Sequence, residues 1–101
     1  MAVEVTDNVG RNRYEIAVDG TVAGFAQYRD MDGTRVFTHT EVSREYEGQG
    51  LGSTLIREAL DDVRSRGRLL VGLCPFVDDY LREHPEYNDL VDPTLDVRLR
   101  D

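Results

Sequence analysis

The sequence contains no lysine, and all 12 of its basic residues are arginine. This absence excludes a nucleotide-binding P-loop, because the G-x-x-x-x-G-K-[ST] signature requires a lysine after its glycines. Cysteine is almost as scarce, since Cys74 is the only one. A single thiol cannot form an internal disulfide and suits a reducing compartment. We therefore expect a cytoplasmic location.

Long apolar runs are also missing. No segment approaches ~18 consecutive apolar residues, the length that a transmembrane helix needs. The first residues, Met-Ala-Val-Glu-Val-Thr-Asp, lack the basic and then apolar pattern of a secretory signal. The two histidines and the cysteine do not have the spacing of zinc ligands. The sequence therefore predicts neither a membrane span nor a signal peptide, and it assigns no metal.

Charge is unbalanced, with 20 acidic residues against 12 basic ones and a net charge of −8. Such a chain does not favour nucleic acid or an anionic membrane as a partner. It would attract cationic amines, although a salt-adapted surface or a coding bias gives the same composition. The length of 101 residues and the hydrophobic fraction of 40% predict a single globular domain over residues 1–101.

The first half of the chain has the pattern of an antiparallel meander. Asp19-Gly20 is a strong signal for a two-residue hairpin turn, and Asp30-Met-Asp-Gly33 predicts a second turn. The expected strands are Val3–Thr6, Arg13–Val18, Thr21–Tyr28 and Thr34–Val42.

The second half changes to a helical period. From Leu51 onward the apolar residues fall on one helical face, and Gly67 stands where glycine usually ends a helix. Leu69–Leu73 is a continuous apolar run, typical of a strand buried on both faces. A strand, a helix and a strand in succession form a crossover, so this run should lie parallel to Val36–Val42.

A second helix is expected after the buried strand. Pro75 suits its first position, and Pro85 should end it. Its apolar stripe would contain Phe76, Val77, Tyr80 and Leu81. The alternation in Thr94–Leu99 predicts a last strand.

Three glycines at alternate positions, Gly48, Gly50 and Gly52, lie between the strand that ends at Val42 and the helix that follows. A turn without side chains leaves backbone N–H groups free for an anion, and the helix dipole adds partial positive charge there. The spacing G-x-G-x-G differs from the dinucleotide fingerprint G-x-G-x-x-G. We predict a pyrophosphate site; the alternative is a tight loop with no ligand.

The motif Gln49-Gly50-Leu51-Gly52 resembles the second half of the acyl-CoA loop, [Q/R]-x-x-G-x-[G/A], of the GNAT superfamily of GCN5-related N-acetyltransferases. Glu47 departs from this pattern, because the family prefers arginine or glutamine there. Further motifs are similar to a short, single-domain branch of the superfamily called the YjdJ type. They lie between residues 36 and 90: Thr38-His-Thr-Glu-Val42, Gly72-Leu-Cys-Pro-Phe-Val77, Tyr80 and His84-Pro-Glu-Tyr87.

The resemblance implies an α/β (α+β) chain with a minimal GNAT fold, in which the meander is followed by a β-α-β crossover and a second helix, without the usual N-terminal helices. It also implies acetyl-CoA as the acyl donor and an unidentified amine as the acceptor. The implied acetyl-CoA-binding residues are Val42, Glu47, Gly48, Gln49, Gly50, Leu51, Gly52, Ser53, Cys74, Pro75, Phe76 and Tyr80.

Four residues are candidates for catalysis. His39 and Glu41 alternate on one strand and therefore project from one face, where either is a candidate base; alternatively, His39 packs in the sheet and Glu41 faces water. Cys74 ends the buried strand before a helix, where it would accept the acetyl group, line the acyl pocket or serve only as core. Tyr80 would protonate the CoA thiolate, as the resemblance implies, or belong to the core.

Three functions remain open. The first is acetyl-CoA-dependent N-acetyl transfer. The second is a non-catalytic acyl-CoA-binding or regulatory domain, and the third is an interaction domain that has lost the ligand. Binding of acetyl-CoA separates the third from the others, and acetyl transfer to an amine separates the first from the second.

Overall fold

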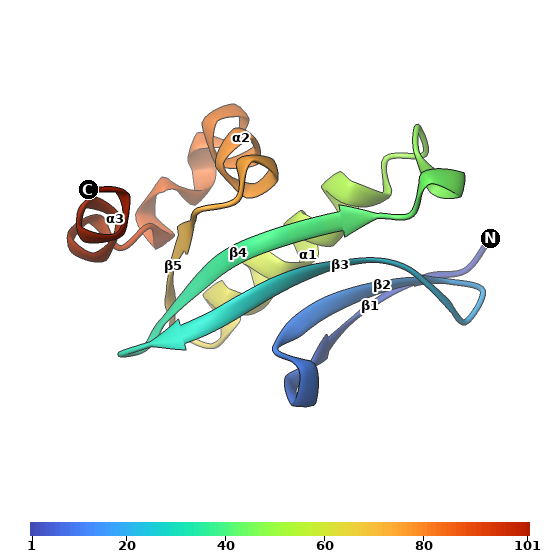
Figure 1. Cartoon of the computed structure of the whole chain (residues 1–101), viewed down its shortest axis with the longest axis horizontal. Helices are drawn as coiled ribbons and strands as arrows, with labels where there is room; N and C mark the ends of the chain where they lie inside the picture. Colours follow the sequence, from blue (N-terminus) through green and yellow to red (C-terminus); the bar gives the residue numbers. More distant parts are fainter.

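The computed structural model describes all residues, Met1–Asp101. Its centre is a mixed sheet of five strands in the order β1-β2-β3-β4-β5 (Figure 1). Strands β1 to β4 are antiparallel neighbours, and β5 is parallel to β4. The predicted meander and crossover are therefore confirmed. The strands are β1 Val3–Asn8, β2 Arg13–Val18, β3 Thr21–Met31, β4 Thr34–Val42 and β5 Leu69–Gly72.

Both hairpin turns consist of Asp-Gly. In Asp19-Gly20 the φ angles are 49° and 85°, and in Asp32-Gly33 they are 50° and 85°. Positive φ at both positions is the geometry of the type I′ turn, which matches the twist of the flanking strands. The second turn is thus shorter than the predicted Asp30–Gly33, because Asp30 still pairs with Arg35 in the ladder.

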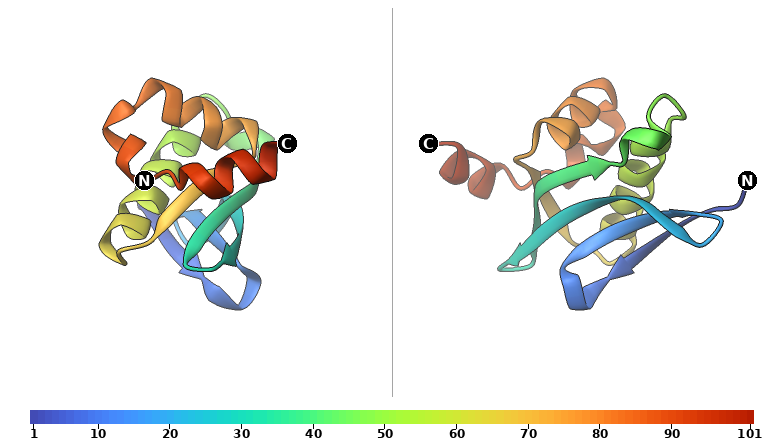
Figure 2. Two further views of the ribbon diagram at one scale, coloured as in Figure 1. Left: turned by 90° about the vertical axis from the view of Figure 1, so that its left-hand side faces the viewer. Right: turned by 45° about the vertical axis from the view of Figure 1, so that its right-hand side comes forward.

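Helix α1, Leu51–Ser65, covers one face of the sheet (Figures 1 and 2). Gly67 follows it with φ 66°, as the sequence predicts for a helix end. Its buried face packs into one core with Tyr14, Ile16, Tyr28 and Phe37 of the strands. The buried residues of the helix are Leu51, Leu55, Ile56, Ala59, Leu60 and Val63. Burial of each large apolar side chain stabilises the fold by roughly 1.5–3 kcal/mol.

Helix α2 spans Pro75–Glu83, and the 3-10 turn Pro85–Leu90 follows it. Pro85 therefore ends the helix, as predicted. The expected apolar stripe is correct for three residues but not for Phe76, which is 42% exposed. Two more 3-10 turns, Val9–Arg11 and Arg44–Tyr46, follow β1 and β4. None of the helices has the length and the apolar composition that a membrane crossing requires.

The expected strand Thr94–Leu99 is wrong, because this segment forms helix α3, Pro93–Arg100. The Asp92 side chain caps the helix by accepting a hydrogen bond from the Leu95 N–H at 3.1 Å. The Arg100 guanidinium bonds both Asp96, four residues earlier, at 2.8 Å and the Gly72 carbonyl at 2.7 Å. These bonds hold α3 beside β5 (Figure 1).

A buried arginine connects the meander to the core. Arg35 is 3% exposed, and its guanidinium lies 3.8 Å from the ring centroid of Tyr28. It donates hydrogen bonds to Asp30 at 2.8 and 3.0 Å and to the Tyr14 hydroxyl at 2.7 Å. The Tyr14 hydroxyl in turn donates to Asp62 of α1 at 2.6 Å. A buried charge requires such partners, so this network fixes how the sheet meets α1.

Candidate functional site

Strands β4 and β5 diverge halfway along β4. Their pairing ends at Phe37 and Gly72, and the Phe37 carbonyl accepts hydrogen bonds from the N–H groups of Leu73 and Cys74 at 3.0 and 3.3 Å. Beyond this point β4 continues to Val42 with β3 as its only neighbour. The second half of β4 therefore has an open edge, and the first turns of α1 and α2 meet at Gly52 and Phe76.

The glycine turn leads from this open edge into α1. Gly48 and Gly50 have φ angles of 83° and 74°, a region in which residues with a side chain are strained. The first helical hydrogen bond runs from the Thr54 N–H to the Gly50 carbonyl. The N–H groups of Leu51, Gly52 and Ser53 have no acceptor within the protein. They form the positive end of the helix dipole, which is suited to an anion.

Gly52 has a different role. A Cβ atom there would lie 2.3 Å from Cζ of Phe76, which is closer than real contacts allow. Space around Gly48 and Gly50 is open, with no atom within 4 Å of an added Cβ. Two glycines thus permit the backbone turn, and the third lets the Phe76 ring lie against the start of α1.

Most of the predicted binding residues surround one cavity of about 220 Å³ at the start of α1. Gln49 and Pro75 do not line it, and neither does Cys74. Tyr46 does line it, and sequence reasoning missed this residue because no motif contains it. The lining residues are Val42, Tyr46, Glu47, Gly48, Gly50, Leu51, Gly52, Ser53 and Phe76.

A second cavity of about 210 Å³ adjoins the first and shares Ser53 and Phe76 with it. Tyr80 lines this second cavity together with two acidic residues of α2, Asp79 and Glu83. The Phe76 ring is the common wall, so the predicted residues of α1 and α2 contribute to one continuous region.

Tyr80 differs from the other buried tyrosines. The hydroxyls of Tyr14, Tyr28 and Tyr87 each donate to an aspartate, at 2.6 to 2.7 Å, whereas the Tyr80 hydroxyl has no hydrogen-bond partner in the protein. Burial raises the pKa of Tyr80 above its ordinary value of about 10, at which a phenol is already protonated at neutral pH. The ring stacks on His84 at a centroid distance of 4.0 Å. This leaves a protonated hydroxyl for a ligand.

Cys74 precedes Pro75 at the start of α2 and is 5% exposed. Its Sγ lies 3.3 Å from Oγ1 of Thr40, a residue of the open edge of β4. The thiol therefore lies where the two strands separate, as its place at a strand end predicts. Thr40 belongs to the Thr38–Val42 motif, but only the three-dimensional structure shows its contact with the thiol.

His39 and Glu41 project together from the outer face of the sheet, which α1 does not cover. Nε2 of His39 lies 3.2 Å from Oε1 of Glu41, and the side chains are 54% and 61% exposed. The alternative in which His39 packs inside the sheet does not apply. The Phe25 ring lies beside His39, with centroids 5.9 Å apart.

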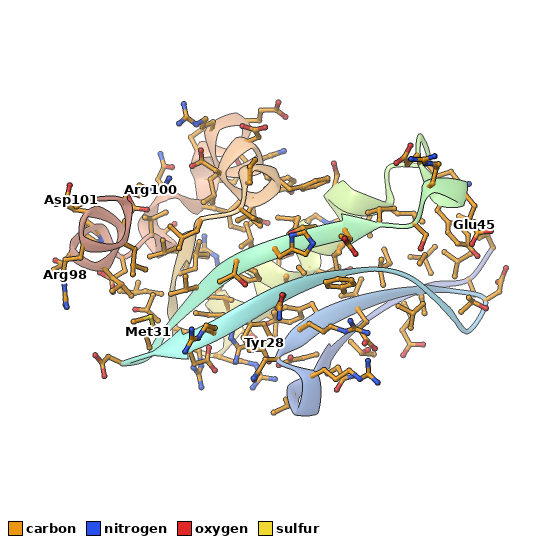
Figure 3. All side chains as sticks on the ribbon, in the orientation of Figure 1. Tyr28, Met31, Glu45, Arg98, Arg100 and Asp101 are labelled. Atoms are coloured by element: carbon orange, nitrogen blue, oxygen red, sulfur yellow. The ribbon has the colours of Figure 1, made fainter.

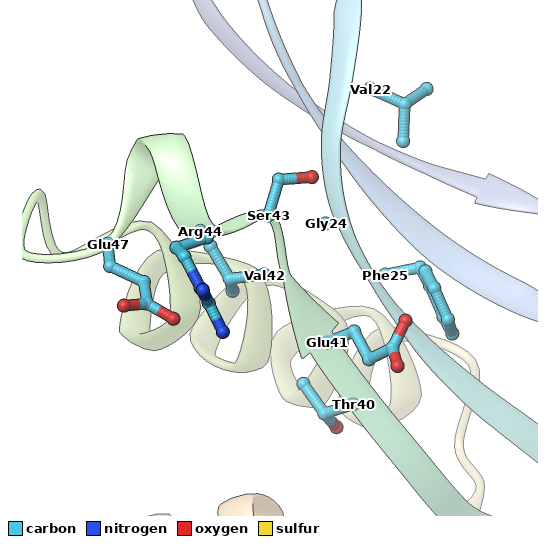
Figure 4. A pocket seen from close by; sticks show the side chains of 9 residues that line it. All are labelled: Val22, Gly24, Phe25, Thr40, Glu41, Val42, Ser43, Arg44 and Glu47. Atoms are coloured by element: carbon cyan, nitrogen blue, oxygen red, sulfur yellow. The ribbon is translucent and has the colours of Figure 1, made fainter.

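An open hollow of about 520 Å³ lies on this outer face, around the end of β4 (Figure 4). It shares Val42 and Glu47 with the cavity at the start of α1. No ion pair within 4.0 Å joins Glu47 to Arg44, the arginine three residues before it. The lining residues are Val22, Gly24, Phe25, Thr40, Glu41, Val42, Ser43, Arg44 and Glu47.

No three histidine, cysteine, aspartate or glutamate side chains gather closely enough to hold a metal ion. The groups that the site offers are the free N–H groups at the start of α1, the Cys74 thiol, the Tyr80 phenol and the His39–Glu41 pair.

Comparison with known proteins places these features in a family. The family model of the GCN5-related N-acetyl-transferase matches residues 13–90. A GCN5-like candidate N-acetyltransferase from Staphylococcus aureus superposes with a TM-score of 0.67 and 25% identity, covering 88% of this chain and 87% of its own. None of the curated proteins compared with the sequence matches it.

Two larger enzymes share the fold at lower identity. The ribosomal-protein-S18-alanine N-acetyltransferase of Escherichia coli has a TM-score of 0.56 and 24% identity, covering 59% of this chain and 39% of its own. N-acetylglutamate synthase of Neisseria gonorrhoeae, in complex with coenzyme A and N-acetyl-glutamate, has a TM-score of 0.58 and 17% identity, covering 77% of this chain and 22% of its own.

Proposed function

Because the chain belongs to the GCN5-related N-acetyltransferase family, we propose that it transfers an acetyl group from acetyl-CoA to an amine. The start of α1 is the observation that carries this proposal. Three N–H groups without protein acceptors face a cavity built by the glycine turn. They suit the pyrophosphate of CoA, and Glu47 is the one lining group whose charge opposes it.

The open edge of β4 supports the same proposal. Acetyl-CoA supplies the acetyl group as a thioester and leaves as the thiol. An extended group that starts at the glycine turn and follows the unpaired half of β4 reaches Thr40 and the adjacent Cys74 thiol. Cys74 lines the acyl end of this path, where β5 gives way to α2.

Three side chains take part in proton transfer. His39 accepts the proton of the attacking amine, because an imidazole is a suitable base near neutral pH. Glu41, 3.2 Å away, orients the His39 ring and stabilises its cation. Tyr80 donates its proton to the departing thiolate, since a phenol is protonated at neutral pH and its hydroxyl has no partner in the protein.

We favour direct transfer from the thioester to the amine, with Cys74 as a wall of the acyl pocket. In the two-step alternative, the Cys74 sulfur attacks the thioester carbonyl, the C–S bond to CoA breaks, and the amine then displaces Cys74 from the acetyl group. Both routes end in the same amide and free CoA, so only an acceptor-free experiment separates them.

The test incubates the protein with acetyl-CoA and each member of a panel of amines. Release of the CoA thiol is measured, and the products are identified by mass spectrometry. The proposal predicts thiol release that depends on the amine, with an equal amount of acetylated product. Binding of acetyl-CoA without transfer to any amine would instead indicate an acyl-CoA-binding domain. Absence of binding would indicate an interaction domain.

A further inference from the structure

The hollow on the outer face of the sheet is the feature that the proposed function leaves without an assigned role. It lies around the end of β4, with Glu41 on the face of the sheet that α1 does not cover, and adjoins the cavity at the start of α1 through Val42 and Glu47. Thr40 lines it and also contacts the Cys74 sulfur at 3.3 Å. A molecule in the hollow that contacts Thr40 is therefore one residue away from the Cys74 thiol, beside which the acetyl group would be presented.

The walls of the hollow combine apolar surface with charge. Val22, which is 46% exposed, and Phe25 form the apolar part. Figure 4 shows Glu41 beside Phe25, with Glu47 and Arg44 together on the other side. Such walls suit an aliphatic stem with polar ends.

The charges of the lining do not cancel. It contains two carboxylates, Glu41 and Glu47, and one guanidinium, Arg44, so it has one excess negative charge. The nitrogen that attacks the thioester must be neutral and cannot compensate this charge. A second, protonated nitrogen on the same acceptor can. The hollow extends from Thr40 to Ser43, a strand rise of about 10 Å, so the two nitrogens need a long stem between them.

We propose that the acceptor is an unbranched aliphatic diamine or polyamine, bound in the hollow between β3, β4 and the turn that follows β4. This inference rests on the proposed function. One nitrogen lies near Thr40 and attacks the acetyl group, and a second, protonated nitrogen is held by the acidic lining. An acceptor with a distal carboxylate is repelled by the same lining.

Three probes with one six-carbon stem test the proposal: 1,6-diaminohexane, hexylamine and 6-aminohexanoate. We expect kcat/KM to be about fivefold higher for the diamine than for hexylamine, the effect of one partly exposed ion pair, and lowest for the amino acid. The preference should shrink at about 1 M salt, where the screening length is ~3 Å. Equal kcat/KM values for the diamine and hexylamine, or a higher value for the amino acid, would overturn the proposal. A higher kcat/KM for a lysine whose α-amino and carboxyl groups are blocked than for the diamine would also overturn it.

Charge-neutralising variants locate the effect. Glu47→Gln and Glu41→Gln should each lower the ratio of diamine to hexylamine activity toward one, whatever they do to the absolute rate. Glu45→Gln is the matched control, because Glu45 is an exposed carboxylate of the same turn that lines no cavity (Figure 3). Glu45→Gln should keep the ratio of diamine to hexylamine activity of the unsubstituted protein. A ratio that falls equally in all three variants would mean that net charge, rather than the hollow, sets the preference, and the proposal would be wrong.

A binding experiment distinguishes failure of the diamine site from failure of the proposed transferase activity. If no amine is acetylated, calorimetry of 1,6-diaminohexane with the protein–CoA complex still decides the question. Binding that Glu47→Gln weakens and Glu45→Gln does not would support the diamine site in a protein that lacks transferase activity. Absence of binding would overturn the diamine site.

Discussion

Alanine at Gly50 separates the backbone requirement of the glycine turn from its role in binding. Gly50 precedes α1 with φ 74°, and Gly67 follows the same helix with φ 66°. A Cβ at either position meets no atom within 4 Å. Alanine in the left-handed region costs about 1–2 kcal/mol, partly offset by about 0.4–1 kcal/mol from the less flexible unfolded chain. Both Gly50→Ala and Gly67→Ala should therefore lower the free energy of unfolding by about 1 kcal/mol, as urea denaturation would measure.

The two variants should differ in acetyl-CoA affinity. Position 50 lines the same cavity as the residues with free N–H groups, 51–53, so a methyl group there takes up space that the anion needs, whereas position 67 is at the opposite end of α1. Loss of one hydrogen bond to a charged group is worth about 1.5–3 kcal/mol, or roughly 10- to 100-fold in the dissociation constant. Calorimetry should show this loss for Gly50→Ala and unchanged affinity for Gly67→Ala. Equal affinities in two folded variants would refute the assignment of the anion to the glycine turn.

Further predictions concern charge, the thiol and the buried arginine. Glu47→Arg should tighten acetyl-CoA binding in calorimetry, most at low salt; weaker binding would show a structural role for Glu47. Direct transfer predicts that intact-mass spectrometry without acceptor finds no acetyl adduct on Cys74 and that Cys74→Ser stays active; a stoichiometric, hydroxylamine-sensitive adduct would contradict it. Arg35→Met should destabilise the fold by about 3–5 kcal/mol in urea. The Arg35 hydrogen bond holds the pKa of Asp30 below its usual range. The contribution of the Asp30–Arg35 pair to stability is therefore present above about pH 4 and should decline as pH falls further. If Asp30→Asn left the decline of unfolding free energy at low pH unchanged, this contribution would be refuted.

The meander could be predicted from local signals. Both Asp-Gly pairs demand positive φ, and only the extent of the second turn was wrong. The crossover followed from chain order, because a strand, a helix and a buried strand leave one common arrangement. The glycine turn was also visible in the sequence, since alternate glycines before a helix predict a backbone turn, and Gly48 and Gly50 have positive φ.

The last helix could not be predicted from alternation. Thr94–Leu99 alternates like a strand, but the Asp92-Pro93 start and the Asp96–Arg100 pair favour a helix. A short segment satisfies both patterns, and its contact with the Gly72 carbonyl selects the helix. Local pattern alone contains no information on that contact.

The site was predicted only in part for a similar reason. Motifs located the glycine turn, the thiol and the tyrosine, but cavities are built across elements. Tyr46 and Thr40 enter the site through neighbours that are distant in the sequence. Helical spacing placed Phe76 in the apolar stripe with Val77 and Tyr80, and only the family resemblance placed it among the binding residues; in the structure it lies against Gly52 and forms the wall between two cavities.

An amide NMR titration with acetyl-CoA tests the central claim most directly, because it reports where the ligand binds. The N–H groups of Leu51, Gly52 and Ser53 lack protein acceptors and should receive hydrogen bonds from the pyrophosphate. The account predicts that these amides, together with Gly50, show the largest chemical-shift changes, with smaller changes along Thr38–Val42. A spectrum that does not change, or one whose largest changes lie outside the start of α1 and the open edge of β4, would contradict it.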